Sequence, residues 1–108
     1  MTESRNESQP IRFDLRVPVR YRVSSERMWH EGNTINIGRA GVLFEGDEQF
    51  PPGTRLELSI LLPLAVGGRA SARIACHATV VRTVERQLMD VRISGTRIRR
   101  NMPEKPAA

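Results

Sequence analysis

The chain has 108 residues, near the common size of one domain and too short for two separate hydrophobic cores. Hydrophobic residues make up 39% and charged residues 27%, and the net charge is +5. No apolar run approaches the roughly 20 residues of a membrane span, and the polar start MTESRNESQP lacks the apolar core of a secretory signal. We therefore expect a one-domain cytoplasmic protein without a membrane span.

The first predicted strand follows a polar segment. Residues 1–9 are polar and patternless, and residues 101–108 (NMPEKPAA) have the same character, so both are predicted to be disordered tails around a domain at 10–100. In VPVRYRV the apolar side chains alternate with Pro18, Arg20 and Arg22. This period of two predicts a strand that buries one face. The residues on that face are Val17, Val19, Tyr21 and Val23.

The next two strands are predicted on either side of a glycine-rich corner. WHEGNTINI places Trp29, Ile35 and Ile37 on one face, and we expect all three to pack in the core. The corner NIGRAG, residues 36–41, leads into VLF, where Val42 and Phe44 share a face. A plain hairpin turn needs fewer glycine and polar residues than this corner contains.

The rest of the chain continues the same alternation. Pro51, Pro52 and Gly53 predict a turn before RLELSILLP, and the LAVGGRAS stretch is predicted to be a loop. Two further strands are predicted around CHATVV and LMDVRIS. No segment has a sustained helical period, which leaves six short strands. They must close on themselves to protect their edges, so we predict an all-β, six-stranded antiparallel barrel or split barrel with flexible N- and C-terminal tails.

Little in the sequence suggests catalysis or metal binding. Cys76 alternates with Ile74 and Ala78, as a small buried residue would. His30 and His77 have no evident third ligand for a metal. There is no Ser/His/Asp arrangement, paired acidic cluster or phosphate-binding P-loop. We expect neither enzyme activity nor a cofactor.

Arginine dominates the basic residues, because Lys105 is the only lysine among 17 Lys and Arg. The arginine side chain is a rigid fork of donors that suits phosphates, guanine edges and carboxylates. A GC-rich genome would also produce this bias, so each arginine has to be assigned by its position. Arg12, Arg16 and Arg20 recur at a spacing of four, just ahead of and within the first predicted strand.

These arginines, followed by the NIGRAG corner on an all-β frame, resemble the PilZ domain family. That family has an RxxxR element before its first strand and a (D/N)xSxxG element further along. The RVPVRYR strand, the GVLF and PPGT segments and the strands around CHATVVR are also similar, so the resemblance runs from about Arg12 to Ser94. It implies a six-stranded antiparallel barrel that binds the bacterial second messenger cyclic di-GMP.

The resemblance also implies which residues would bind that ligand. Arg12 and Arg16 match RxxxR and would contact its guanines and phosphates. Asn36 and Gly41 match the first and last positions of the second element, with Gly38 and Arg39 between them. Arg16 and Arg20 form a second RxxxR, so either this pair or the pair four residues earlier could match the family element. We favour the earlier pair and place Arg20 near the site.

Gly38 departs from the family, which has serine at that position. Losing a neutral hydrogen bond of about 0.5–1.5 kcal/mol would weaken affinity by up to roughly tenfold. The sequence therefore leaves three functions open. The first is a cyclic di-GMP sensor that orders its arginine-containing N-terminal segment on binding and signals to an unidentified protein partner. The second is a PilZ-like interaction module that binds no nucleotide. The third, a basic barrel for single-stranded nucleic acid, is disfavoured because only 5% of residues are aromatic.

Overall fold

The computed structural model describes residues 11–63, 71–85 and 87–101, with the side chains of 98–101 left aside. The described residues form seven β strands and no helix, and so contain no helix that could cross a membrane. The strands are β1 (Arg12–Asp14), β2 (Pro18–Val23), β3 (His30–Gly38), β4 (Gly41–Gly46), β5 (Arg55–Pro63), β6 (Ser71–Val84) and β7 (Leu88–Asn101). The predicted tail at 1–9, residues 102–108 of the predicted tail at 101–108 and most of the predicted LAVGGRAS loop lie outside the described residues. Asn101, which was predicted to begin the C-terminal tail, is the last residue of β7.

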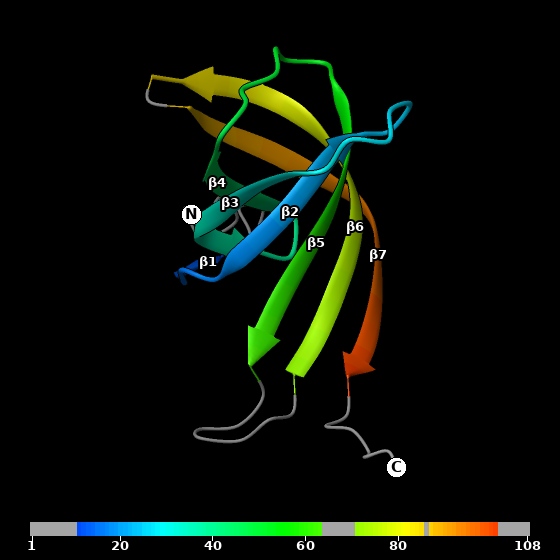
Figure 1. The fold of residues 1–108 in the computed structure, drawn as a ribbon. Helices are drawn as coiled ribbons and strands as arrows, with labels where there is room; N and C mark the ends of the chain where they lie inside the picture. Colours follow the sequence, from blue (N-terminus) through cyan, green and yellow to red (C-terminus); the bar gives the residue numbers. More distant parts are fainter. Residues whose placement is uncertain (1–10, 64–70, 86, 102–108) are drawn as a thin grey trace.

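Six of the strands close into a ring. The order around it is β3-β2-β5-β6-β7-β4, every pairing is antiparallel, and β3 pairs with β4 to complete the circle. The long strands β5, β6 and β7 curve side by side along one wall, and β2 crosses in front of them (Figure 1). The prediction of a six-stranded antiparallel barrel is therefore confirmed. Closure leaves each of these six strands paired on both edges.

The seventh strand, β1, was not predicted. It pairs with the end of β3, where Arg12 is opposite Gly38 and Asp14 is opposite Asn36. Further along the same edge of β3, Pro18 of β2 is opposite Asn33. The arginine-containing lead-in is therefore an extra edge strand in this structure. Three residues are too few to give a readable alternation, which is why the sequence pattern did not reveal it.

The core fills the ring with the alternating residues of β2, β4, β5, β6 and β7. Its buried members are Val17, Val19, Tyr21, Val42, Phe44, Leu56, Leu58, Ile60, Cys76, Ala78, Val80, Met89 and Val91. The predicted inward faces of these strands are confirmed. The Tyr21 ring packs edge-on against Phe44 at 4.9 Å between centroids, and its hydroxyl donates to the Glu48 carbonyl at 2.6 Å and accepts from the Glu48 N–H at 2.9 Å.

The predicted core face of β3 was wrong for Trp29 and Ile35, whereas Ile37 packs against the core as predicted. Thr34 is fully buried, whereas Ile35 and Ile37 are only partly so, and the pairing with β4 shifts register between Thr34 and Asn36. That bulge changes the alternation in mid-strand. Trp29 is not in the core. Its half-buried ring lies under the guanidinium carbons of Arg22 at 4.8 Å and Arg20 at 5.4 Å from the ring centroid.

The predicted turn at 51–53 is present. The Thr54 N–H donates to the Pro51 carbonyl at 3.2 Å, and Gly53 has a φ of +95°. Proline fixes the first corner of such a turn, while glycine accepts the positive φ of the second without steric cost. The turn reverses the chain into β5.

Candidate nucleotide-binding site

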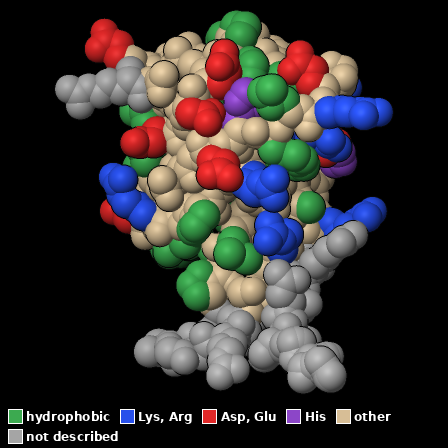
Figure 2. Space-filling model, viewed as in Figure 1, with side chains coloured by type: hydrophobic (Ala, Val, Ile, Leu, Met, Phe, Trp, Pro, Cys, Tyr) green, Lys and Arg blue, Asp and Glu red, His purple; other side chains and the backbone are tan. Residues whose placement is uncertain are grey.

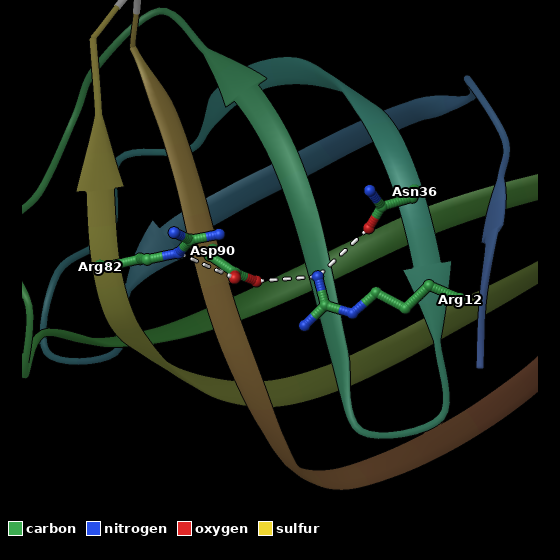
Figure 3. Close-up of polar contacts among 4 residues, drawn as sticks. All are labelled: Arg12, Asn36, Arg82 and Asp90. Atoms are coloured by element: carbon green, nitrogen blue, oxygen red, sulfur yellow. Dashed lines mark hydrogen bonds and ion pairs between the residues drawn. The ribbon is translucent and has the colours of Figure 1, made fainter. Parts of the chain in front are cut away.

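Arg12 of β1 lies at the centre of a chain of polar contacts on the outside of the barrel. Its Nη1 donates to the Asn36 Oδ1 at 3.2 Å and to the Asp90 Oδ1 at 3.0 Å. The other Asp90 oxygen accepts from the Arg82 Nε at 3.3 Å. Figure 3 shows Arg12 reaching from β1 between Asn36 and Asp90, with Arg82 on the far side of the carboxylate. Strands β1, β3 and β7 thus meet at the Arg12 guanidinium, and β6 joins them through the Asp90 carboxylate.

The strand alternation explains why these side chains face outward together. Asp90 alternates with the buried Met89 and Val91, and Asn36, Leu43 and Asp90 are opposite one another across β3, β4 and β7. Residues paired in this way project from the same face of a sheet. The Arg12 cluster, meaning Arg12, Asn36, Arg82 and Asp90, therefore lies on the outer wall made by β3, β4 and β7.

Gly38 and Gly41 form the floor under Arg12. A β-carbon on Gly38 would lie 2.8 Å from the Arg12 Cγ and 2.8 Å from the Ile11 carbonyl oxygen. One on Gly41 would lie 2.5 Å from the Arg12 Nη2 and 2.7 Å from the Val91 carbonyl oxygen. Neither glycine has a positive φ. A β-carbon is excluded at both positions because the Arg12 side chain and the carbonyl oxygens of Ile11 and Val91 come too close.

Thr34 fixes the crossing between β1 and β2. Its hydroxyl accepts from the Val17 N–H at 2.9 Å and donates to the Leu15 carbonyl. The Leu15 N–H donates to the Ile35 carbonyl at 3.2 Å. Buried backbone groups need partners, and this side chain supplies two where the ladder between β3 and its neighbours is interrupted. Arg16 lies between β1 and β2, next to this crossing, and is exposed.

The remaining residues predicted for the site fall into two groups. Arg16 and Arg39 are exposed, and Arg39 stands in the two-residue turn between β3 and β4. Arg20 is on the outer face of β2 and lies over Trp29. The structure brings Arg12, Asn36, Gly38 and Gly41 into direct contact, and it places Arg20 among the strands of a different wall.

A small hollow adjoins the cluster. It has a volume of about 320 Å³, and Phe13, Ile37, Gly38 and Arg39 contribute to its lining. Phe13 is 67% exposed although it is a large apolar residue. The hollow extends to the core residues Val42 and Ile60, and it shares only Gly38 with the residues that contact Arg12.

Sequence reasoning missed Asp90 and Arg82. Asp90 lies in LMDVRIS as an ordinary outward residue of an alternating strand, and nothing local to it indicates that Arg12 will lie against it. Its side chain is only 12% exposed because two arginines cover it. The one available signal was a carboxylate in a strand where arginines predominate.

Two ionisable side chains in the core, those of Tyr21 and Cys76, have raised pKa values. Burial raises the pKa of Tyr21 from its ordinary value of 10.0 to about 12, and the Asp47 carboxylate adds to the rise. Burial also raises the pKa of the Cys76 thiol, although a hydrogen bond with Thr96 opposes the rise. A buried thiol held in its neutral form is a poor nucleophile. Among the described residues, no three His, Cys, Asp or Glu side chains gather as a metal site would require.

Fold and site together define a small antiparallel barrel with an arginine-centred polar cluster on its outer surface. The sequence profile of the PilZ domain matches residues 3–106, nearly the whole chain. The chain belongs to the PilZ domain family, a family of cyclic di-GMP-binding adaptor domains rather than enzymes. A comparison with curated protein sequences finds no match.

Proposed function

We propose that this protein is a cytoplasmic cyclic di-GMP sensor that passes its signal to a protein partner. The observation that carries the proposal is the position of Arg12. The first arginine of RxxxR lies across both glycines of the second family element and donates to its asparagine. Two elements separated by more than 20 residues thus act as one surface, as a site assembled from both requires.

Charge and shape support the same ligand. Arg16 and Arg39 are exposed, Arg39 is close to Gly38 in the chain, and Arg92 follows Asp90 on the outer face of β7, opposite Gly41. Cyclic di-GMP has two phosphodiester charges and two guanines whose O6 and N7 atoms accept from arginine. The hollow beside Phe13 and Ile37 would give a purine face an apolar contact.

Ligand binding in this proposal is an exchange of partners by Arg12. The guanidinium now shares its charge with Asp90. A guanine or phosphate would replace that carboxylate, and Arg16 would close from the other side. Because Arg12 belongs to β1, a new position of its side chain would alter the pairing of β1 with β3 and reorder the N-terminal segment. A changed segment would present a new surface to the partner.

Calorimetric titration with cyclic di-GMP tests the proposal, with GTP and a short single-stranded RNA as control ligands. We expect saturable binding of cyclic di-GMP, and we expect Arg12→Ala or Arg16→Ala to abolish it. Arg27→Ala, an exposed arginine outside the cluster, serves as the matched control and should bind normally. Binding that survives Arg16→Ala would contradict the assignment.

One observation favours a second candidate, a PilZ-type interaction module that binds no nucleotide. Gly38 replaces the family serine, and Asp90 already occupies Arg12. If the titration gives no heat while the protein remains folded, this second function replaces the first. Binding of the RNA alone would instead support the nucleic-acid function.

A further inference from the structure

A second arginine surface lies on the wall formed by β2, β5, β6 and the end of β7. It is a groove with a volume of about 640 Å³, and we call it the arginine groove, lined by Arg20, Trp29, Ser59, Arg73, Ala75 and Arg97. In Figure 2, basic side chains occupy the middle of this face and its right edge, while acidic side chains gather toward the top. The Arg12 cluster belongs to the wall of β3, β4 and β7.

The strand register explains the shape of the groove. Arg20 is opposite Ser59, Ser59 opposite Ala75, and Ala75 opposite Arg97. These four paired residues form a row across the sheet. Because the side chains of Ser59 and Ala75 are short, the surface is depressed in the middle of the row, between the long arginine side chains at its two ends. Trp29 closes one side, where the guanidinium carbons of Arg20 and Arg22 lie over its ring. These stacking contacts fix the direction of Arg20.

Among the described residues, the groove carries more positive than negative charge. Glu57 is its one carboxylate among the described residues, and Arg22 holds it through Nε at 3.1 Å and Nη2 at 2.8 Å. Within the same part of the chain, Arg20, Arg73 and Arg97 form no ion pair. Arg73 uses one donor on the Ser59 hydroxyl at 2.8 Å, which orients its guanidinium and leaves its other N–H groups for a ligand.

We propose that the arginine groove docks an extended acidic segment of a partner protein. Neighbouring strands are about 4.8 Å apart, so Arg20 and Arg97, three strand spacings apart, are separated by about 14 Å at their backbones. An extended peptide advances about 3.3 Å per residue, and alternate side chains face one way. Carboxylates at positions i, i+2 and i+4 therefore span about the same distance. Each can accept two hydrogen bonds from an arginine fork.

The aromatic content of the groove favours a peptide over single-stranded nucleic acid. Binding of successive bases depends on aromatic rings open for stacking. Trp29 is the only aromatic ring among the lining residues other than the His77 imidazole, and two guanidinium groups already lie against it. The ligand that these groups select is therefore a series of carboxylates. This inference goes beyond the proposed nucleotide function and does not depend on it, since the two surfaces share no arginine.

Titration of the full chain with a fluorescein-labelled oligoglutamate of about eight residues tests the proposal without cyclic di-GMP present. The fluorescence anisotropy of the labelled peptide measures binding. The fluorescence of Trp29, the sole tryptophan, reports whether the peptide binds at the arginine groove. We expect saturable binding that changes the Trp29 emission and weakens as salt is added. The double variant Arg73→Gln/Arg97→Gln should weaken binding by about tenfold or more, since it removes two charged donors.

The double variant Arg27→Gln/Arg55→Gln removes the same charge from exposed positions outside the groove and should bind the peptide normally. Equal weakening by both double variants would overturn the proposal, because it would mean attraction to net charge alone. Absence of peptide binding would also overturn it. Tighter binding of a uridine oligonucleotide of equal charge would assign the groove to nucleic acid. Unchanged thermal melting of each variant confirms that the barrel is intact.

Discussion

The guanidinium of Arg12 and the carboxylate of Asp90 lie 3.0 Å apart, although 78 positions separate the two residues in the sequence. The pair joins the extra strand β1 to the last strand of the barrel. Asp90 is nearly buried by its two arginine partners, so screening by solvent is weaker here than for an exposed pair. An anionic ligand at Arg12 must therefore compete with a carboxylate of the protein itself.

Asp90→Asn should strengthen binding of cyclic di-GMP. The change removes the competing charge while keeping the shape, and a charged hydrogen bond of about 1.5–3 kcal/mol corresponds to roughly tenfold or more in affinity. Calorimetry measures the effect. Asp14→Asn, which removes an exposed carboxylate from β1, is the control and should change affinity little. A loss of affinity in Asp90→Asn would mean that the carboxylate positions Arg12 for the ligand.

Gly38→Ser restores the serine of the family and should weaken the pairing of β1 with β3. The new β-carbon would lie 2.8 Å from both the Arg12 Cγ and the Ile11 carbonyl, closer than such contacts allow. We expect faster hydrogen exchange at residues 12–14, tighter binding of cyclic di-GMP because the hydroxyl returns and Arg12 leaves Asp90, and little change in barrel melting. Unchanged exchange at these amides would contradict the close approach.

Gly41→Ala should disturb the site and lower stability together. Its β-carbon meets the Val91 carbonyl at 2.7 Å as well as the Arg12 Nη2 at 2.5 Å, and the backbone oxygen cannot move aside as a side chain can. We expect a loss of about 1–3 kcal/mol in the free energy of unfolding and weaker nucleotide binding. Gly95→Ala is the matched control, because its β-carbon would find only the His77 Cδ2, at an ordinary 3.9 Å.

Thr34→Val should destabilise the barrel by about 1–3 kcal/mol, since the buried Val17 N–H loses its acceptor while the side-chain shape stays nearly the same. Denaturant unfolding measures the loss. Thr54→Val removes an exposed threonine hydroxyl that bonds to the Pro51 carbonyl, and it should cost less. Equal costs would mean that the Thr34 hydroxyl does not stabilise the crossing between β1 and β2.

Alkaline pH should destabilise the protein through Tyr21. The pKa of Tyr21 in the folded protein is raised to about 12 from 10.0, so the unfolded chain loses the phenolic proton first. The stabilisation is fully present below pH 10 and is lost as the pH rises from about 10 to about 12. As Tyr21 is the only tyrosine, phenolate absorbance follows it directly. Tyr21→Phe should flatten the stability profile in this window, and an apparent pKa near 10 in the folded protein would contradict the prediction.

The sequence predicted the barrel well where alternation is regular. Val17, Val19 and Tyr21 are buried as expected, and so are Leu56 and Leu58. A period of two is a property of neighbouring residues and can be read without knowing the partner strand. The turn at Pro51–Gly53 was predictable for the same reason, because its chemistry is local.

The failures arose where distant strands determine the outcome. The bulge after Thr34 depends on how β3 pairs with β4, and Ile35, which lies at the bulge, is only partly buried. Trp29 lies outside because Arg20 and Arg22 of another strand offer it a surface. The contact between Arg12 and Asp90 depends on ring closure, so no pattern near either residue predicts it.

Closure of the ring also bears on how the chain folds. β4 pairs with its sequence neighbour β3 and with β7, which lies more than 40 residues further along the chain. Such long-range pairings incur the entropy of closing large loops before they gain contacts, and domains dominated by them fold in milliseconds to seconds. The Arg12 cluster draws residues from both sides of this seam. The proposed nucleotide site is therefore complete only when the ring has closed, and a partly closed chain would give no signal.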